Sequence, residues 1–311
     1  MGDKVGSIYK EYLKILNDDA CDFIGKYLSV PSLVRLKNIS YFCGMDYASK
    51  DIYSFKEYIS RFDHSLSVAL ITWKCTRNKK DTLAALFHDI STPCFSHVID
   101  YMNKDYIKQE STECFTEEIL RSDEYLLKCL KEDNINLEEI INFKNYTIVD
   151  NNRPKLCADR LDGVILTGLF WTQNLNINQV KNIINSLAIY INEDSEKEIG
   201  FKEIAVLKLV VDVNKSIDLY CHSNEDNYMM ELLSDITKTA ILKGYIKYED
   251  LYKLTEDKVF SIFENCNDDE ILNKLALFKY IKLENIPNVY LPNVKIRSLK
   301  PLINGIRFKK N

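Results

Sequence analysis

Two histidines and an aspartate are the residues of this chain whose types and spacing best suit chemistry. The stretch LAALFHDISTPCFSHVID (residues 83–100) contains His88, followed directly by Asp89, and then His97. The chain has four histidines in all, and His64 brings three of them within 34 residues. Imidazole and carboxylate groups together suit a divalent cation such as Mn, Fe, Co, Ni, Zn or Mg. The clustering therefore indicates a metal site, of unspecified metal.

His88 and Asp89 lie at the end of a strongly apolar segment, TLAALFHDI. Polar side chains at the edge of a core need partners, and one cation would satisfy both. Adjacent helical residues point about 100° apart, so the pair can hold one ion only where the helix ends and the backbone bends. Pro93 is expected to end this helix. The alternative is a hydrogen-bonded pair at a helix end.

Two ligands do not hold a metal tightly, so further ligands are expected elsewhere. His64 lies in SRFDHSLSVA, on the polar edge of a predicted helix, and Asp159 lies in LCADRLDGVI, at the edge of another. The four residues would supply two imidazoles and two carboxylates, leaving positions for water and a phosphate oxygen. The alternative for His64 is a core histidine. Asp162, one turn after Asp159, is expected to form a structural salt bridge or to support the ligands.

Composition limits the classes of protein that this chain can belong to. Of its 311 residues 46% are hydrophobic and 28% charged, and the net charge of −5 makes nucleic acid an unexpected partner. No apolar run approaches the ~20 residues that span a bilayer. The first residues lack a signal-peptide core, and Gly6 breaks the myristoylation pattern, so we expect a cytoplasmic location without membrane contact. Nine scattered cysteines without CxxC spacing fit a reducing compartment.

We expect the secondary-structure elements that position these residues to be mostly helices, because Gly (9) and Pro (6), which interrupt helices, are scarce. Apolar residues at helical spacing predict helices within residues 8–28, 62–78, 79–90, 116–133, 137–143, 157–171, 178–193, 201–222 and 226–244. Residues 285–303 alternate apolar and polar residues and contain three prolines, which predicts a short strand pair or an extended tail. The expected fold class is therefore all-α with a short β or extended C-terminal tail, in one domain over residues 1–311. The polar stretch near residue 195 is the alternative boundary between two lobes.

The segments around these residues resemble the HD superfamily of metal-dependent phosphohydrolases. SRFDHSLSVA is similar to R-F-x-H-S-x-G-V, with Ser67 at the usual glycine. AALFHDISTPCFSHVID resembles A-A-L-L-H-D-I-G-H-x-P-F-S-H of the deoxynucleoside triphosphate triphosphohydrolase-like branch, and ADRLDGVI resembles its D-R-x-D-Y helix. VKIRSLKPLI is similar to its C-terminal K-x-R-x-x-D-P strand, with Lys300 at the aspartate. The resemblance covers residues 30–170 well, which implies an HD-type helical core there and a helical extension over residues 171–311.

The resemblance implies a role for each candidate residue. The metal ligands of the family fall on His64, His88, Asp89 and Asp159. Arg61 falls on an arginine that contacts the phosphate or base of the substrate, and Arg160 on a basic residue that contacts phosphates. His97 falls on a histidine that is a candidate for phosphate contact or proton transfer. Glu110 is a candidate for proton transfer in place of missing histidines. The implied substrate is a small phosphorylated molecule, with a nucleotide as the first candidate, and a homo-oligomer is possible.

Three further departures from the family pattern concern the expected active site. Thr92 and Gln109 stand where the family has histidines near the scissile phosphate, and Gly163 stands where it has a tyrosine that helps to hold the nucleotide. The first hypothesis is a metal-dependent phosphohydrolase that acts on a nucleotide or another small phosphate ester. The second is a catalytically degenerate HD protein that binds metal and nucleotide as a regulatory or sensor module. The third, a metal-assisted oxygenase, usually needs more histidines than this chain has.

Overall fold

The computed structural model describes residues 6–17, 22–109, 113–289 and 294–309. The helices of the N-terminal half are α1 (Ser7–Leu16), α2 (Pro31–Arg35), α3 (Arg61–Thr76), α4 (Lys79–Phe87), α5 (Val98–Met102), α6 (Thr116–Ser122), α7 (Glu124–Glu132), α8 (Glu138–Ile141) and α9 (Ala158–Phe170). The later helices are α10 (Ile177–Asn185), α11 (Ile204–Cys221), α12 (Asn224–Leu242), α13 (Glu256–Asn265) and α14 (Asp269–Tyr280). No described helix is both long enough and apolar enough to cross a membrane.

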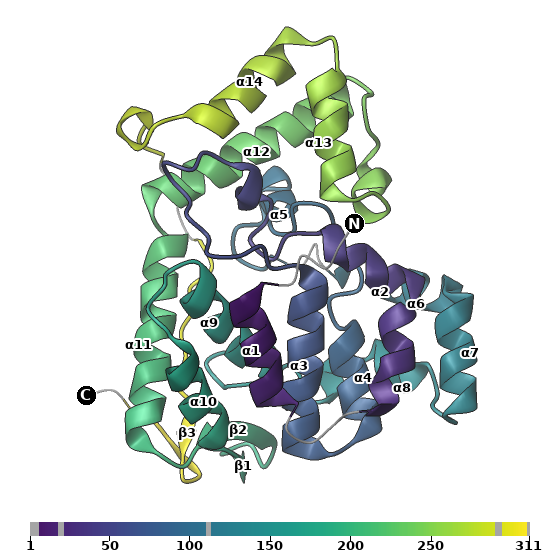
Figure 1. Ribbon diagram of the computed structural model, residues 1–311, viewed down its shortest axis with the longest axis vertical. Helices are drawn as coiled ribbons and strands as arrows, with labels where there is room; N and C mark the ends of the chain where they lie inside the picture. The colour runs from purple at the N-terminus through teal and green to yellow at the C-terminus, as the bar shows by residue number, and fades with distance from the viewer. Residues whose placement is uncertain (1–5, 18–21, 110–112, 290–293, 310–311) are drawn as a thin grey trace.

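Helix α3 lies at the centre of the fold, packed between α4 and α9 (Figure 1). Its first turn is fixed by a capping box, in which Ser60 accepts from the Asp63 backbone and Asp63 accepts from the Ser60 backbone. The helix ends at Arg77, whose φ of 53° is left-handed. Residues on nearly every side of α3 are buried, so its polar side chains must find partners inside the protein.

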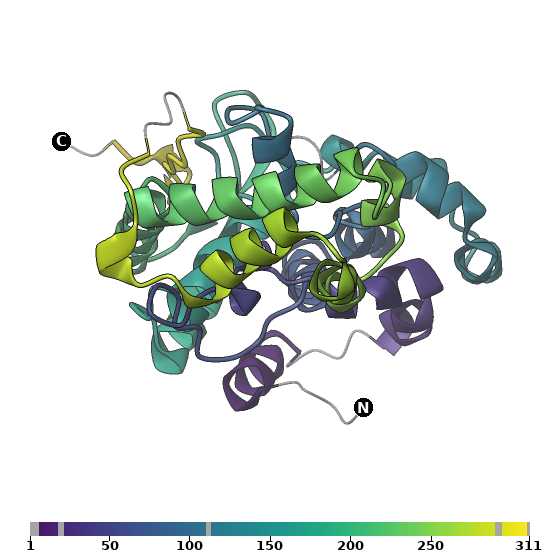
Figure 2. The same cartoon turned by 90° about the horizontal axis from the view of Figure 1, so that it is seen from above.

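Helices α12, α13 and α14 lie over one end of the bundle formed by α3, α4 and α9 (Figures 1 and 2). The segment before α13 joins the loop that follows α4, because the Cys94 backbone donates to the Leu251 carbonyl at 2.7 Å. Arg35 of α2 donates to carbonyl oxygens of both segments, at Thr92 and Leu254. One continuous cluster of buried apolar side chains runs from Tyr9 to Leu299. This continuity supports the proposal of a single domain.

A four-stranded sheet, in the order β1-β2-β3-β4, closes the opposite end of the molecule (Figure 1). The strands are β1 (Leu187–Ile191), β2 (Lys197–Phe201), β3 (Leu302–Ile303) and β4 (Ile306–Arg307). β2 pairs in parallel with β3, whereas the two outer pairs are antiparallel. A Cβ on Gly200 would lie 2.7 Å from the Leu302 carbonyl oxygen, so this close pairing requires glycine.

The prediction of a mostly helical chain is confirmed, but the all-α prediction is wrong at this sheet. The segment predicted as a helix over 178–193 ends its helix at Asn185, and LAIYI continues as β1 because its β-branched and aromatic side chains suit a strand. The polar stretch near residue 195 is the turn of the β1–β2 hairpin. The C-terminal strand pair lies at residues 302–307, later than expected. The helix predicted over 116–133 is broken at Asp123, which caps α7 instead.

Candidate metal centre

His64, His88 and Asp89 each place one potential ligand atom within 4.8 Å of the others. His64 lies in the first turns of α3, and His88 is the residue that ends α4. Asp89 follows in a turn, closed by a hydrogen bond from the Thr92 backbone to the Asp89 carbonyl. The helix therefore ends before Pro93, earlier than the sequence predicted, and the change of direction turns both side chains to one point.

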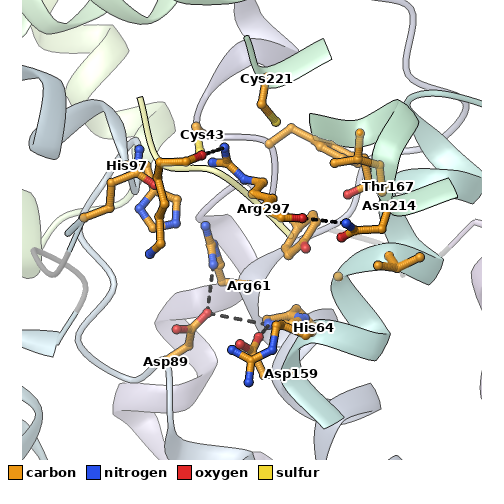
Figure 3. Close-up of a pocket in the computed structure, with 18 of the residues that line it drawn as sticks. Cys43, Arg61, His64, Asp89, His97, Asp159, Thr167, Asn214, Cys221 and Arg297 are labelled. Atoms are coloured by element: carbon orange, nitrogen blue, oxygen red, sulfur yellow. Dashed lines mark hydrogen bonds and ion pairs between the residues drawn. The ribbon is translucent and has the colours of Figure 1, made fainter. Parts of the chain in front are cut away.

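Asp159, the fourth predicted ligand, lies in the first turn of α9 and meets this group from the opposite side (Figure 3). Its Oδ1 atom lies 3.0 Å from His64 Nε2 and 3.7 Å from His88 Nε2. Burial would raise the pKa of Asp159, but the hydrogen bond with His64 and the nearby imidazole of His88 hold this pKa well below its usual range. The structure thus brings together all four residues predicted as metal ligands.

His88 offers the clearest test of whether a metal fits this group. Its Nδ1 atom lies 2.7 Å from the Ala85 carbonyl oxygen, which can only accept, so Nδ1 carries the proton. Its Nε2 atom is buried and has no hydrogen-bond partner among the described residues. Asp89 Oδ1 lies 3.8 Å away and Asp159 Oδ1 3.7 Å away. Burial would lower the pKa of His88, but these two carboxylates raise it. A buried ring nitrogen left in this way beside two carboxylates suits a cation, which would take the place of a proton.

Asp162 supports the second imidazole from behind. Its Oδ2 atom lies 2.7 Å from His64 Nδ1 and accepts a hydrogen bond from Ser67 at 2.8 Å, while its Oδ1 atom accepts one from Tyr12 at 2.7 Å. Burial alone would lower the pKa of His64, but the hydrogen bonds with Asp159 and Asp162 raise it to about 10. A carboxylate behind a ligating imidazole fixes the ring and makes it a better ligand.

Arg61 lies beside the predicted metal ligands at the start of α3 (Figure 3). Its Nη1 atom donates to Asp89 Oδ2 at 2.8 Å and its Nε atom to Ser96 Oγ at 3.2 Å. Burial would raise the pKa of Asp89, but His88 and Arg61 lower it to about 2. The guanidinium also lies over the ring of Tyr41, 5.1 Å from its centroid. Arg61 is therefore held by three contacts beside the ligands.

Gly163, at the position of the family's tyrosine, makes room for Tyr41. A Cβ on Gly163 would lie 3.1 Å from the Tyr41 hydroxyl oxygen. The Tyr41 ring lies 4.9 Å from the His64 ring, centroid to centroid. Tyr41 thus places an aromatic ring beside the predicted metal ligands. The family pattern has its aromatic ring on the helix that corresponds to α9.

A cavity of about 470 Å³ opens above these ligands. Cationic side chains line it, and they come from four separate segments: Arg61, Lys108, Lys144, Arg153, Arg160, Lys295 and Arg297. Figure 3 shows Arg297 beside Arg61, in the middle of the view. Lys295 and Arg297 were missed as candidates, although the K-x-R resemblance of VKIRSLKPLI was the available signal. A concave site rich in cations suits a phosphorylated ligand.

His97, Arg160 and Glu110 are placed differently. His97 lines the cavity, and its Nδ1 lies 2.9 Å from Asp100 Oδ2. Burial lowers the pKa of His97, and Arg61 and Lys295 lower it further against the effect of Asp100. Arg160 lines the cavity too, but its Nε donates to the Lys155 carbonyl at 2.9 Å and its Nη2 to Asn151. Its contact with phosphate stays a prediction. Glu110 lies outside the described residues.

The two residues that replace the family's histidines have different surroundings. Gln109 lines the cavity. Thr92 is buried, and its hydroxyl has no hydrogen-bond partner among the described residues. His222, the fourth histidine, ends α11, and its Nδ1 atom lies 2.6 Å from the Asp218 carbonyl oxygen.

No family model matches the chain. It is 25% identical over 219 residues, 70% of its length, to the uncharacterized protein YdhJ of Bacillus subtilis, and it spans 65% of that protein. It is 20% identical over 249 residues, 78% of its length, to the metal-dependent phosphohydrolase cns2 of Cordyceps militaris, of which it covers 70%.

Two solved structures share the fold. A hypothetical protein from Aquifex aeolicus has a TM-score of 0.57 at 17% identity, over 88% of this chain and 71% of the other. A phosphohydrolase from Bacteroides thetaiotaomicron has a TM-score of 0.57 at 14% identity, over 81% of this chain and 71% of the other. These likenesses show a shared fold.

Proposed function

We propose that this protein is a metal-dependent phosphohydrolase of HD type that acts on a small phosphate ester. The observation that carries the proposal is the buried Nε2 atom of His88, which faces Asp89 and Asp159 without a hydrogen-bond partner in the described chain. This group borders a cavity lined by cations. A similar protein in C. militaris is named a metal-dependent phosphohydrolase, which supports the same activity.

His64, His88, Asp89 and Asp159 would hold the divalent cation, whose identity among Mn, Fe, Ni, Co, Zn and Mg the donor set leaves open. When bound, the cation polarises a phosphoryl oxygen and lowers the pKa of a bound water. His64 would give up a proton on binding the cation, because its Nε2 atom now shares a hydrogen bond with Asp159.

The remaining residues of the site bind and orient the phosphoryl group. Arg61, fixed by Asp89 and Ser96, presents a cation beside the proposed ligands, and Arg297 lines the same cavity. Fixed cations of this kind stabilise the charge that develops on phosphoryl oxygens. His97 is neutral at pH 7, because its pKa is lowered, so it can accept a proton. Arg160 and Glu110 remain proposed contributors.

The test is metal analysis of the full chain purified without chelator, followed by a panel of phosphate monoesters, diesters and deoxynucleoside triphosphates with Mn²⁺, Ni²⁺ or Co²⁺. We expect metal-dependent release of phosphate or triphosphate that is lost in His88→Ala and Asp89→Ala. His222→Ala is the matched control, since this histidine lies at the end of α11, away from the ligands. Protein that takes up no divalent metal would overturn the proposal.

The second candidate is a degenerate HD protein that binds metal and nucleotide without turnover. The observation that favours it is that Thr92 and Gln109 stand where the family has histidines. Gln109 lines the cavity, but its amide side chain cannot transfer a proton near neutral pH as a histidine can. Nucleotide binding to metal-loaded protein without any release of phosphate would support this candidate over the first.

A further inference from the structure

The cavity contains a second group of lining residues with a different chemistry from the metal centre. Aromatic rings line it from the segment 42–55 and from the end of α9. Phe42 and Phe55 stack with centroids 4.3 Å apart, and Tyr53 stacks on Phe55 at 5.6 Å. Trp171 lies 6.1 Å from Phe55. Such walls suit a flat apolar or aromatic group of a ligand.

Asp226, in the first turn of α12, lines the cavity beside these rings. Its Oδ1 atom accepts a hydrogen bond from the Tyr53 hydroxyl at 2.7 Å. Its Oδ2 atom accepts none from the residues that the structure describes, and no described cation lies within ion-pair distance of it. Burial raises the pKa of Asp226 to about 6, so it is ionised at neutral pH. One carboxylate oxygen is therefore left for a ligand.

Two hydrogen-bond donors near Asp226 are already committed. The Tyr53 hydroxyl donates to Asp226 itself, and the Tyr101 hydroxyl donates to Asn227 at 2.8 Å. The Arg297 guanidinium lies near enough to lower the pKa of Asp226, but no ion pair joins the two described side chains. The Asn214 amide donates to the Arg297 carbonyl at 2.5 Å, which leaves its oxygen as an acceptor. A ligand that contacts Asp226 Oδ2 must bring a hydrogen-bond donor, and on a flat ring that donor is an N–H group.

We propose that Asp226 binds an amino or imino N–H group on a flat heteroaromatic ring that packs against the aromatic wall. The inference rests on the proposed function, and it adds the substrate class: a phosphate ester whose other end is a nitrogen heterocycle with N–H donors, as in a nucleoside. In this proposal the metal centre and the cationic side chains of the cavity bind the phosphate, and the carboxylate of Asp226 selects the ring.

The first experiment measures ring binding without phosphate. Calorimetric titration of the full chain uses adenosine against purine riboside and guanosine against inosine, because each pair differs by one ring amino group. We expect at least one amino-bearing nucleoside to bind about 10-fold to 100-fold more tightly than its partner, as for a hydrogen bond to a charged group. This difference should disappear in Asp226→Asn. No preference in the wild type would overturn the inference.

The control variants separate recognition from folding. Glu225→Gln removes the same charge from the neighbouring position of α12, and Glu225 is not among the cavity-lining residues. It should keep the preference. Circular dichroism checks that each variant folds. An equal loss in Glu225→Gln and Asp226→Asn would overturn the inference.

Failure of this inference is distinguishable from failure of the proposed function. Nucleoside binding needs neither turnover nor a phosphoryl group. Metal-dependent phosphate release that is indifferent to Asp226→Asn, with no nucleoside binding, would overturn the ring site and leave the phosphohydrolase standing. Nucleoside selectivity without release of phosphate from any ester would support the ring site and overturn the first hypothesis of function.

Discussion

The Nδ1 atom of His64 lies 2.7 Å from Oδ2 of Asp162, and both side chains are buried. The carboxylate therefore fixes the imidazole with its Nε2 atom directed at the proposed metal position. This relationship explains why α9 has two aspartates one turn apart: Asp159 faces the ligands, and Asp162 holds one of them.

Replacing Asp162 by Asn is expected to weaken metal binding by about 10-fold to 100-fold, because the imidazole loses its charged partner. Calorimetric titration with Mn²⁺ measures the change. Asp63→Asn is the matched control, since Asp63 is adjacent to His64 but bonds to Ser60 at the start of α3. Similar metal affinities for the Asp162 variant and the wild type would contradict the proposed support.

Metal binding is expected to raise the melting temperature of the wild-type protein. A ligand that binds only the folded state stabilises it by about 2.7 kcal/mol at one hundred times its dissociation constant. His88→Ala should remove this increase, because it deletes the ligand atom that lacks a protein partner. Differential scanning calorimetry with Mn²⁺ and with chelator measures both proteins. An increase that survives in His88→Ala would show that the ion binds elsewhere.

Arg61→Lys is expected to lower kcat/KM by about 100-fold, since an ammonium cannot reproduce the fork that contacts Asp89 and Ser96. Steady-state kinetics with the best substrate of the panel measures the loss. The control is Arg121→Lys, at an exposed arginine that pairs with Glu117. Unchanged kinetics in Arg61→Lys would remove this residue from the phosphate site.

Glu256 should make the stability of the wild type depend on pH. Burial, partly offset by the hydrogen bond from the Phe95 backbone, raises the pKa of Glu256 to about 8. The folded state then binds a proton that the unfolded state releases near pH 4.5, so the contribution of Glu256 to stability falls as pH rises from about 4.5 to 8. The fall is about 1.4 kcal/mol per pH unit at most.

Glu256→Gln removes this titration and keeps an acceptor for Phe95. We expect the variant to match the wild type near pH 5 and to melt at a higher temperature at pH 8.5. Melting curves at several pH values measure the gap, and Glu249→Gln at an exposed position is the control. A gap that stays constant with pH would mean that Glu256 keeps its ordinary pKa.

The metal-centre residues could be proposed from sequence because each lies in a short, characteristic segment. RFDHS, FHDI and ADRLD identify His64, His88, Asp89 and Asp159, and helical spacing identifies the helices that bring them together. The supporting role of Asp162 also followed, since it lies one turn beyond Asp159 on the same helix.

The other features depend on contacts between distant parts of the chain. The pairing of β2 with β3 joins residues 200 and 302, and LAIYI alone fits either a helix or a strand. Tyr41 reaches Gly163, and Glu256 reaches Phe95, through folding that no local pattern encodes. In the sequence, Asp226 resembles any acidic residue in the first turn of a helix, and only the folded structure shows that it lines the cavity.

The parallel pairing of β3 with β2 has a consequence for the C-terminal tail. Pairing with β2 holds the chain at Leu302, and the Lys300 backbone donates to the Pro154 carbonyl at 2.8 Å. These contacts fix the position of the segment that precedes Lys300. Lys295 and Arg297 are thereby delivered to the cavity. Deleting about ten residues from this end would remove β3 and its pairing with β2. Lys295 and Arg297 would then no longer be held at the cavity, which would lose their positive charge.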